Sequence, residues 1–266
     1  MATLGLTAEQ KRFYDENGFV VCRGLLPADE ARVLRQESHE LASRLVKFRS
    51  INAAWATIQH TNTVVQHCHD VQFYSAAFSR LIVDPRFTAV AASIIGPNVQ
   101  LHHTKMFIKP PEKGAPFPMH QDYPYFPHQR NTMIAAIFHF DDAPVERGCV
   151  RFVPGSHKLG PIPVSTPDSS LPPDQYPIDK AVPCPANAGD VVFFNYLTIH
   201  GSGINASSEA RTTLLVQMRD PTDPPLKRTH ESRGQGMMLT GVDSSCCTTK
   251  ALDLPAEAPP ATGDKR

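Results

Sequence analysis

The sequence has neither an excess of charge nor a long apolar run. Lysine and arginine together number 26, as do aspartate and glutamate, so the formal net charge is zero and nothing favours a polyanionic partner such as nucleic acid. No stretch of about 18 consecutive apolar residues is present, which argues against a membrane-spanning helix. Residues 1–6 lack the basic region and apolar run of a signal peptide, so we expect a cytoplasmic protein.

Cysteine motifs are missing as well. None of the six cysteines forms a CxxC pair or has the spacing of zinc ligands. In a reducing compartment we expect free thiols, and we interpret the adjacent pair near the C-terminus as incidental surface thiols rather than a redox pair. The six are Cys22, Cys68, Cys149, Cys184, Cys246 and Cys247.

Proline, by contrast, is abundant. The chain has 266 residues, of which 41% are hydrophobic and 25 are prolines. Because proline is excluded from helix interiors and central strands, this number favours a loop-rich, mainly β (α+β) protein over a helical bundle. The length suits one domain. We expect that domain to span residues 1–253, with residues 254–266 as a disordered tail.

Three segments can be separated along the chain. Residues 7–96 carry helical patterns over 7–16, 27–46 and 78–95, the last interrupted near Pro85, with a strand at 19–22. Residues 97–220 carry short apolar or alternating runs with turn signals between them, which indicates a sandwich, barrel or jelly roll. Residues 221–253 form a polar extension. The predicted strands are Val99–Phe107, Ile134–Phe140, Val150–Val153, Val191–Phe194 and Thr212–Met218. The proline-rich segment Leu159–Pro185 is too long for a plain hairpin connection and could cover a site as a lid.

One short motif organises the functional interpretation. His120 and Asp122 are two residues apart, and on a strand such positions point to the same face. His200, at the end of the run Val191–Ile199, is the best third ligand. Two histidines and one carboxylate on one octahedral face are typical of non-haem Fe(II) oxygenases. A His-x-Asp pair alone is weak evidence, since His139 and Asp141 form another, which we interpret as a strand end followed by a turn-capping aspartate.

Arg211 lies on the strand that follows the turn after His200. We expect adjacent antiparallel strands to bring it to the same site, where its guanidinium would bind a carboxylate in a bidentate manner and Ser202 would add a hydroxyl. A surface salt bridge with Glu209 or Asp190 is the alternative for Arg211 taken alone.

Two further histidine clusters have no obvious ligand partners. His67–Asp70 is interpreted as a polar loop or pocket wall rather than a metal site. In the pair His102–His103 one residue must point inward if both lie on a strand, and we assign His103 a structural or pocket-lining role.

Several spaced motifs together resemble the phytanoyl-CoA dioxygenase family over roughly residues 7–220. They are Asn17–Val21, Gly96–Val99, His103–Thr104, Lys109–Pro111, His120–Asp122, Tyr125–Pro127, Gly148–Cys149, Pro154–Lys158, Gly189–Phe194, and His200–Gly203 with Asn205 and Arg211. The resemblance implies a double-stranded β-helix (cupin-like jelly roll) with flanking N-terminal helices. It also implies oxygenase activity that depends on Fe(II) and 2-oxoglutarate.

The same resemblance assigns roles to single residues. His120, Asp122 and His200 would bind iron, and Arg211 and Ser202 would hold the distal carboxylate of 2-oxoglutarate. Phe138 falls where the family has a tryptophan lining the co-substrate pocket. Lys105 falls where the family has a methionine near 2-oxoglutarate, and a lysine that the family uses upstream has no match around residues 61–66. We expect the substrate pocket to be lined by Tyr123, Tyr125, Phe126 and Arg130.

The expected activity is therefore a dioxygenase that uses O2 and 2-oxoglutarate. It would hydroxylate an unactivated C–H bond of a small-molecule metabolite, an acyl-CoA or a natural-product-like compound, and release succinate and carbon dioxide. Desaturation, cyclisation or endoperoxidation at the same iron are alternatives within this class. From other classes we keep a non-catalytic jelly roll that binds a metabolite and a structural zinc-bound cupin. We expect a monomer or a weak homo-oligomer.

Overall fold

The computed structural model describes residues 4–48, 65–164, 166 and 169–245. Within these ranges the helices are α1 (Ala8–Asn17), α2 (Ala28–Phe48), α3 (Ala76–Ile82) and α4 (Pro85–Ile95), with 3-10 turns η1 (Val71–Phe73), η2 (Tyr123–Tyr125), η3 (Val145–Arg147), η4 (Ser156–Leu159) and η5 (Ile178–Lys180). The strands are β1 (Phe19–Cys22), β2 (Gln66–His69), β3 (Val99–Lys109), β4 (Phe117–His120), β5 (Ile134–His139), β6 (Val150–Phe152), β7 (Val182–Cys184), β8 (Val191–Asn195), β9 (His200–Ser202), β10 (Arg211–Arg219) and β11 (Met238–Thr240).

Local sequence signals set the ends of the helices. Thr7 and Gln10 form a reciprocal capping box at the start of α1, and Gly18 ends that helix with a left-handed backbone. Asp84 caps α4 and Pro85 occupies its first turn, where the missing backbone N–H costs nothing. The break predicted near Pro85 is therefore a real boundary between α3 and α4.

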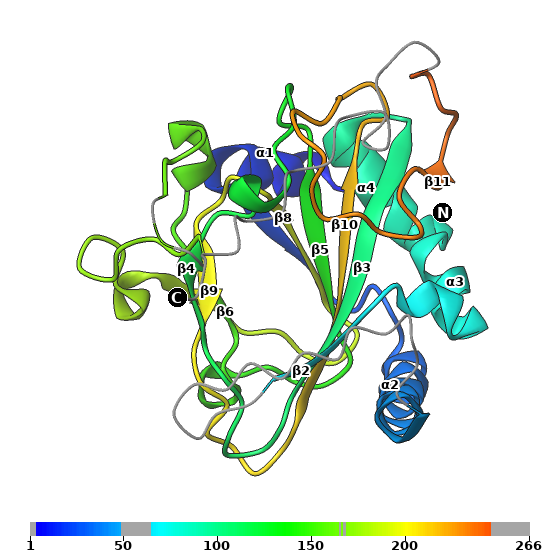
Figure 1. The fold of residues 1–266 in the computed structure, drawn as a ribbon, viewed down its shortest axis with the longest axis vertical. Helices are drawn as coiled ribbons and strands as arrows, with labels where there is room; N and C mark the ends of the chain where they lie inside the picture. Colours follow the sequence, from blue (N-terminus) through cyan, green and yellow to red (C-terminus); the bar gives the residue numbers. More distant parts are fainter. Residues whose placement is uncertain (1–3, 49–64, 165, 167–168, 246–266) are drawn as a thin grey trace, which may run out of the picture.

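The strands form two antiparallel sheets. The large sheet has the order β1-β8-β5-β10-β3-β11, and β2 also pairs with β3. The small sheet has the order β4-β9-β6-β7 and lies across the molecule from the large one, while α2, α3 and α4 lie outside the large sheet (Figure 1). This arrangement confirms the predicted jelly-roll core with flanking helices. The strand predicted at 19–22 is present as β1, and it joins the large sheet together with β2, which also lies within the segment 7–96.

Alternation along β10 shows how the two faces of the large sheet differ. Leu214, Val216 and Met218 belong to the apolar core that includes side chains of the helices. The odd-numbered residues of this strand, among them Arg211 and Gln217, point to the opposite face. We call the helix-covered side the outer face and the side turned toward the small sheet the inner face. The inner face is apolar near β1 and β8, where Phe19 and Phe152 stack, and polar toward β3 and β2.

The segment predicted to be a lid instead covers the back of the small sheet. Leu171 and Ala181 pack against Met119 of β4 and Ile199, and the backbone N–H of Leu171 donates to the carbonyl of Met119. Met119 precedes His120, and Ile199 precedes His200, so these contacts lie on the side away from those histidines. For the described residues of Leu159–Pro185, the expectation of a lid over the site is therefore wrong.

After β10 the chain runs back along the sheet edge as a segment that we call the strap (residues 220–240). Its start is fixed by Asp223, which accepts hydrogen bonds from the backbone of Arg130 and Thr132. In its middle Ser232 donates to Asp70, and at its end β11 pairs with β3. The strap is therefore joined to β3, to the end of β2 and to the loop before β5.

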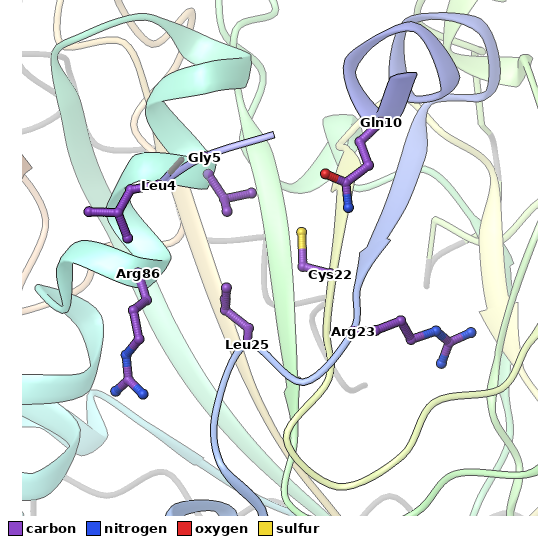
Figure 2. A pocket seen from close by; sticks show the side chains of 8 residues that line it. Leu4, Gly5, Gln10, Cys22, Arg23, Leu25 and Arg86 are labelled. Carbon is purple, nitrogen blue, oxygen red and sulfur yellow. The ribbon is translucent and has the colours of Figure 1, made fainter. Parts of the chain in front are cut away.

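A pocket opens between the N-terminal segment and α4, as Figure 2 shows. Its charged lining is already paired, because Arg86 binds Glu30 and Asp84, and Arg23 binds Asp190. We therefore assign it no ligand. Cys22 in its lining and Cys68, Cys149 and Cys184 are free thiols, as expected, while Cys246 and Cys247 lie outside the described residues. Among the helices in the described part of the chain, none is both long and apolar enough to cross a membrane.

Candidate metal centre

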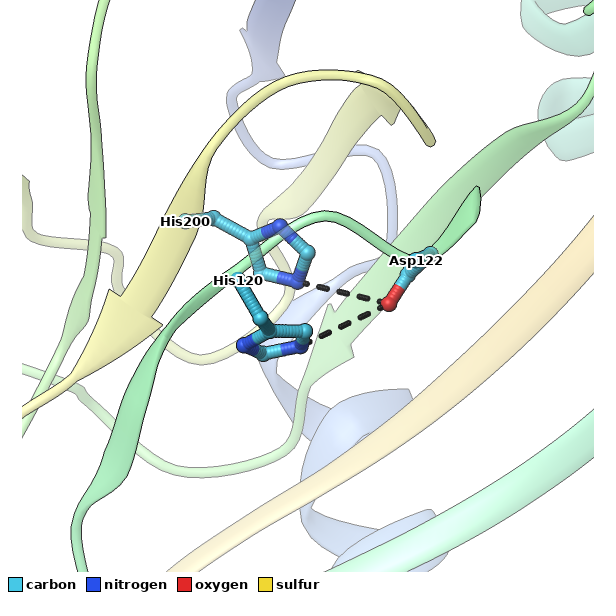
Figure 3. Close-up of side chains that lie close together, drawn as sticks. All are labelled: His120, Asp122 and His200. Carbon is cyan, nitrogen blue, oxygen red and sulfur yellow. Dashed lines mark ion pairs between the residues drawn. The ribbon is translucent and has the colours of Figure 1, made fainter. Parts of the chain in front are cut away.

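The predicted ligands meet where β4 ends and β9 begins. His120 is the last residue of β4 and is paired in register with His200, the first residue of β9. Asp122 follows two residues later, and Figure 3 shows its carboxylate directed at both imidazoles. Short strands of the small sheet thus bring together residues that are 80 positions apart.

The three donor atoms are close enough for one ion to contact all of them. Oδ1 of Asp122 lies 3.5 Å from Nε2 of His120 and 3.7 Å from Nε2 of His200, and all three atoms lie within 4.8 Å of one another. Ligands about 2.1 Å from a cation on one octahedral face are about 3 Å apart, so the observed spacing is slightly wider than a loaded site. No other group of three His, Cys, Asp or Glu side chains within the described ranges meets the same criterion.

Backbone carbonyls fix the ring orientation of both histidines. Nδ1 of His120 lies 2.7 Å from the carbonyl oxygen of Pro118, and Nδ1 of His200 lies 2.9 Å from that of Thr198. A donating Nδ1–H places the lone pair on Nε2, which is the atom turned toward Asp122. Each histidine is thus held as a metal ligand by the residue two positions before it.

Electrostatics favour the protonation states that a metal requires. Burial lowers the pKa of His200 to about 4, and neighbouring His120 contributes to the same direction, so its imidazole is neutral at physiological pH. Burial by itself would raise the pKa of Asp122, but His200, His120 and a hydrogen bond from Gln217 outweigh burial and hold the pKa below its usual value. A neutral imidazole and a carboxylate are the states that coordinate cations.

Gln217 on β10 supports the centre from the large sheet. Its side-chain amide donates to Oδ2 of Asp122 over 2.6 Å, which leaves Oδ1 for the metal side. Second-sphere contacts of this kind orient the ligand. Nothing in the local sequence around Gln217 marks this role. It arises only because β10 of one sheet faces the turn that carries Asp122.

The pairing of His120 and Asp122 has a different cause from the one predicted. β4 ends at His120, and Asp122 has a helical backbone (φ −76°, ψ −20°) at the start of η2. The two side chains converge because the chain turns, and not because they alternate along one strand. The ligand identities still fit a facial site of two histidines and one carboxylate, with the remaining positions left for a co-substrate and oxygen.

A second set of groups lies at the far end of β3 and β10. Arg211 and Lys109 are register partners on these strands, and both side chains are buried. Nζ of Lys109 donates to Oγ of Ser202 and to the carbonyl of Gly203, each over 2.8 Å, while the guanidinium of Arg211 donates to the carbonyl of Gly148. Neither cation has a carboxylate partner among the described residues, so the predicted surface salt bridge of Arg211 is wrong.

Burial lowers the pKa of both cations, that of Arg211 to about 10, and Arg211 further lowers the pKa of Lys109. Buried charges require an opposite charge or dense hydrogen bonding. Two buried cations in register, one of them bonded to the Ser202 hydroxyl, are suited to bind a carboxylate. Lys109 escaped the sequence analysis of the site because its motif, Lys109–Pro110–Pro111, indicated family resemblance without a role.

The route of Arg211 to the site also differs from the prediction. β9 and β10 are not adjacent, because β9 belongs to the small sheet whereas β10 lies between β5 and β3 in the large one. The chain crosses between sheets after Ser202. Arg211 therefore lies on the sheet opposite to the one that carries Ser202.

A family model supports this arrangement of residues from the sequence side. The model described as phytanoyl-CoA dioxygenase matches residues 14–213, which is most of the chain and includes every ligand described above. The chain belongs to the phytanoyl-CoA dioxygenase family. Membership confirms the family to which the motifs pointed.

Known members are similar across most of their length. The human peroxisomal phytanoyl-CoA dioxygenase is 28% identical over 237 residues, which cover 79% of this chain and 67% of the relative. The ectoine dioxygenase of Bordetella parapertussis is 26% identical and covers 83% of this chain and 78% of its own length. Among solved structures, the epimerase SnoN in complex with Fe3+, alpha ketoglutarate and nogalamycin RO is 26% identical with a TM-score of 0.68 and covers 88% of this chain and 96% of that one.

The family and these similarities confirm the predicted class: this chain is an iron- and 2-oxoglutarate-dependent dioxygenase of the phytanoyl-CoA dioxygenase family. The donor set fits Fe(II), since two imidazoles with fixed ring orientations and one carboxylate converge.

Phe138 does not reach this site. Its ring lies on the outer face of the large sheet, 4.8 Å from the ring of Phe87 on α4, in the core shared with the helices. The expectation that Phe138 lines the co-substrate pocket of this family member is therefore wrong. Side chains alternate between the two faces along a strand. Phe138 is paired with Leu214, which points to the outer face, whereas the adjacent His139 points to the inner face.

Lys105 and Phe126 do lie on the side of the metal centre. Lys105 is an inner-face residue that interacts electrostatically with Asp122, and the ring of Phe126 lies 5.5 Å from that of His103. Tyr125 places its ring 6.2 Å from that of His120. These three residues are suited to contact ligands of a dioxygenase of this family.

Tyr123 and Arg130 have other contacts. The ring of Tyr123 packs edge-on against Tyr196, 5.6 Å away. The guanidinium of Arg130 is half-exposed and binds Thr222 and, over 3.7 Å, Asp220 of the strap. Neither is joined to the triad by the contacts in the structure. The role of Arg130 that the contacts support is to fasten the strap.

Proposed function

We propose that this dioxygenase oxidises a C–H bond of a small-molecule metabolite, with hydroxylation as the outcome. One observation carries the proposal. The His120–Asp122–His200 cluster on the small sheet and the Arg211–Lys109 pair on the large sheet serve one molecule that has a metal-chelating end and a carboxylate end. 2-Oxoglutarate has this form. Bound iron would supply the oxidising chemistry with O2, and the co-substrate would leave as succinate and carbon dioxide.

The protein's own residues then have distinct tasks. His120, His200 and Asp122 hold the metal on one face and leave the opposite face open. The guanidinium of Arg211 has free donors for the distal carboxylate, because only one of its nitrogens is engaged with Gly148. The Ser202 hydroxyl accepts from Lys109 and retains its own hydrogen to donate to the same carboxylate. The apolar rings of Phe194 and Phe152 beside His200 exclude water from the metal.

The test is an anaerobic titration of the apoprotein with Fe(II) and then with 2-oxoglutarate, monitored by the weak visible charge-transfer band of the chelate. Wild type is expected to develop the band, His120→Ala to lose it, and Arg211→Ala to require far more 2-oxoglutarate. Arg130→Ala is the matched control, because its guanidinium binds the strap and is expected to leave both titrations unchanged.

Each failure has a distinct meaning. Iron binding without the band would overturn the co-substrate assignment and retain the metal site. Absence of iron binding would overturn the proposed centre and favour a non-catalytic metabolite-binding jelly roll. Metal binding that prefers zinc and ignores 2-oxoglutarate would favour the structural cupin.

The location, partners, oligomeric state and domain bounds of the enzyme are proposed from the sequence. We propose a cytoplasmic monomer or weak homo-oligomer that acts on a small molecule without nucleic-acid or membrane partners, and a single domain over residues 1–253. The balanced charge supports the absence of a polyanionic partner. Sedimentation of the purified protein across a range of concentrations tests the oligomeric state, and a stable complex larger than a dimer would contradict it.

A further inference from the structure

Five basic side chains on the inner face form what we call the basic wall. It consists of Lys105, His67, His69, His103 and His230, and it lies beside the metal centre. Lys105 and His69 are register partners on β3 and β2, and so are Phe107 and His67. His103 is paired with Gln217, the residue that donates to Asp122. None of these wall residues is used by the metal or by the proposed carboxylate site at Arg211.

The strap completes the wall. It carries His230, whose ring lies 4.1 Å from that of His103 and 5.4 Å from that of His69. His230 has a left-handed backbone (φ 51°), a conformation that residues with a Cβ adopt infrequently. A segment far away in the sequence thus turns one more imidazole toward the same place.

The wall has donors without partners. Lys105 is half-buried and makes no hydrogen bond or ion pair with any of the described residues, and its ammonium lies 5.0 Å from the centroid of the Phe107 ring. Nδ1 of His67 and Nε2 of His230 are buried and have no hydrogen-bond partner among the described residues. Buried polar atoms of folded proteins are nearly always paired, so these two nitrogens beside an ammonium without a counter-ion indicate a missing ligand.

A purely structural role does not account for the wall, because its lysine has no carboxylate partner among the described residues. The imidazoles alone would not decide this: the neighbouring His128 bonds through Nδ1 to the carbonyl of Phe126 but also leaves a buried Nε2 unpaired, and His102 pairs with His103 over 2.8 Å. A second metal does not account for it either, because within the described residues only His120, Asp122 and His200 converge tightly enough to share an ion.

The charge around the wall selects the kind of ligand. Two carboxylates interact with it, Asp122 and Asp70. Asp122 belongs to the metal centre, and Asp70 is engaged by the Ser232 hydroxyl and the backbone N–H of Arg233. Burial lowers the pKa of Lys105 to about 8 and those of His69 and His230 to about 3 and 4. At neutral pH the wall therefore presents one ammonium among neutral imidazole donors, and no carboxylate is free to neutralise it.

We infer that the basic wall binds an oxyanion of the substrate, a carboxylate or a phosphate, with Lys105 as its charged contact and His69 and His230 as hydrogen-bond donors. This inference rests on the proposed function, because it takes the iron and 2-oxoglutarate to occupy the neighbouring site. The anion fixes one end of the substrate beside Asp122, so that a carbon close to that end meets the metal. The substrate class is thus a small anionic metabolite with its acidic group near the oxidised carbon.

The test places a paramagnetic ion in the metal centre and asks whether simple oxyanions bind beside it. The full-length protein is loaded with Mn(II) and 2-oxoglutarate, and the relaxation rates of the 31P signal of inorganic phosphate and the 13C signal of acetate are measured. The variants are Lys105→Met, which removes the charge, Lys105→Arg, which keeps it, and the exposed Lys113→Met as a control. Affinity for 2-oxoglutarate is measured on all four proteins.

The expected result is saturable relaxation of at least one anion by wild type, a reduction of about tenfold or more in Lys105→Met, and retention in Lys105→Arg and Lys113→Met, with 2-oxoglutarate affinity unchanged throughout. Phosphate alone would assign a phosphoryl group, and acetate alone a carboxylate. Equal relaxation in wild type and Lys105→Met would place the anion elsewhere and overturn the inference, as would relaxation of neither anion.

Two other outcomes separate this inference from the function on which it rests. Loss of 2-oxoglutarate affinity in Lys105→Met would assign Lys105 to the co-substrate and overturn the substrate site. Relaxation that depends on Lys105 in a protein that binds no 2-oxoglutarate would support the anion site and overturn the proposed co-substrate instead.

Discussion

The two faces of the large sheet are made by the same strands and have opposite characters. On the outer face, alternate residues of β5, β8 and β10 pack against α3 and α4 in one apolar core. The inner face carries Arg211 and Gln217 of β10 and Lys109 of β3, which are buried but bind polar groups. Because side chains alternate along a strand, neighbouring residues serve different purposes: those on the outer face stabilise the core, and those on the inner face contribute to the site. Substitutions on one face are expected to leave the property of the other almost unchanged.

The largest expected effect is on the outer face. Phe138→Ala removes a fully buried ring that packs against Phe87 and Phe140, and is expected to lower the free energy of unfolding by about 3–5 kcal/mol. Chemical denaturation measures this loss. The affinity of the remaining folded protein for 2-oxoglutarate should stay as in wild type. A weaker 2-oxoglutarate affinity with little loss of stability would place Phe138 in the co-substrate pocket and contradict the division of roles between the two faces.

The next effect is on the inner face, at the carboxylate site. Lys109→Met removes a charged hydrogen-bond donor worth about 1.5–3 kcal/mol, so the dissociation constant of 2-oxoglutarate is expected to rise about 10- to 150-fold. The apoprotein should be no less stable, because a buried cation without a carboxylate partner is removed. Titration of the Fe(II) protein measures the first quantity and denaturation the second. Lys113→Met, four residues along and exposed, is the control; a large loss of stability in Lys109→Met would make this lysine a structural residue.

A somewhat smaller effect is expected at Gln217. Gln217→Leu leaves Oδ2 of Asp122 without its donor, and metal affinity should fall about 10- to 100-fold. Competition with a chelator measures this change. The neighbouring Leu215→Met, also on the inner face, is the control for altered packing. Equal affinities of Gln217→Leu and wild type would show that the carboxylate is oriented without help from the large sheet.

The smallest effect is expected where the residue belongs to neither face. Arg130→Ala removes a half-exposed ion pair with Asp220, and the free energy of unfolding should change by about 1 kcal/mol or less. Metal and 2-oxoglutarate affinities should match those of wild type. A clear rise in the dissociation constant of either ligand would bring Arg130 back to the site predicted from sequence.

Strands with an apolar run could be predicted from the sequence, and strands without one could not. The five predicted core strands are present as β3, β5, β6, β8 and β10, because each shows an apolar or alternating run even where, as in β6, the strand has only three residues. β4 (Phe-Pro-Met-His) and β9 (His-Gly-Ser), which carry the metal ligands, show no such run. The ligands were identified from chemistry and resemblance. Their geometry depends on the pairing of His120 with His200, which sequence spacing does not encode.

Roles that depend on contacts across the sheets were missed for the same reason. Gln217 and Lys109 act through Asp122 and Ser202, which lie on the other sheet or in the turn beside it. The register between β10 and β3 shifts next to the pair Gln217–His103, and this irregularity was missed as well. At this bulge His102 and His103 both reach His230, whereas regular alternation predicts that only one of the pair points inward. Local periodicity holds no information about any of these contacts.

The strap offers a practical route to new substrates. It is one contiguous segment that brings a single wall residue, His230, to the site, and it is joined to the rest by Asp223 at one end, by Ser232 to Asp70 in the middle and by β11 at the other end. Neither metal ligands nor the Arg211–Lys109 pair lie within it. An engineer can therefore exchange residues 224–231, between the attachments at Asp223 and Ser232, as a cassette and recombine the same iron site with a library of substrate-facing loops.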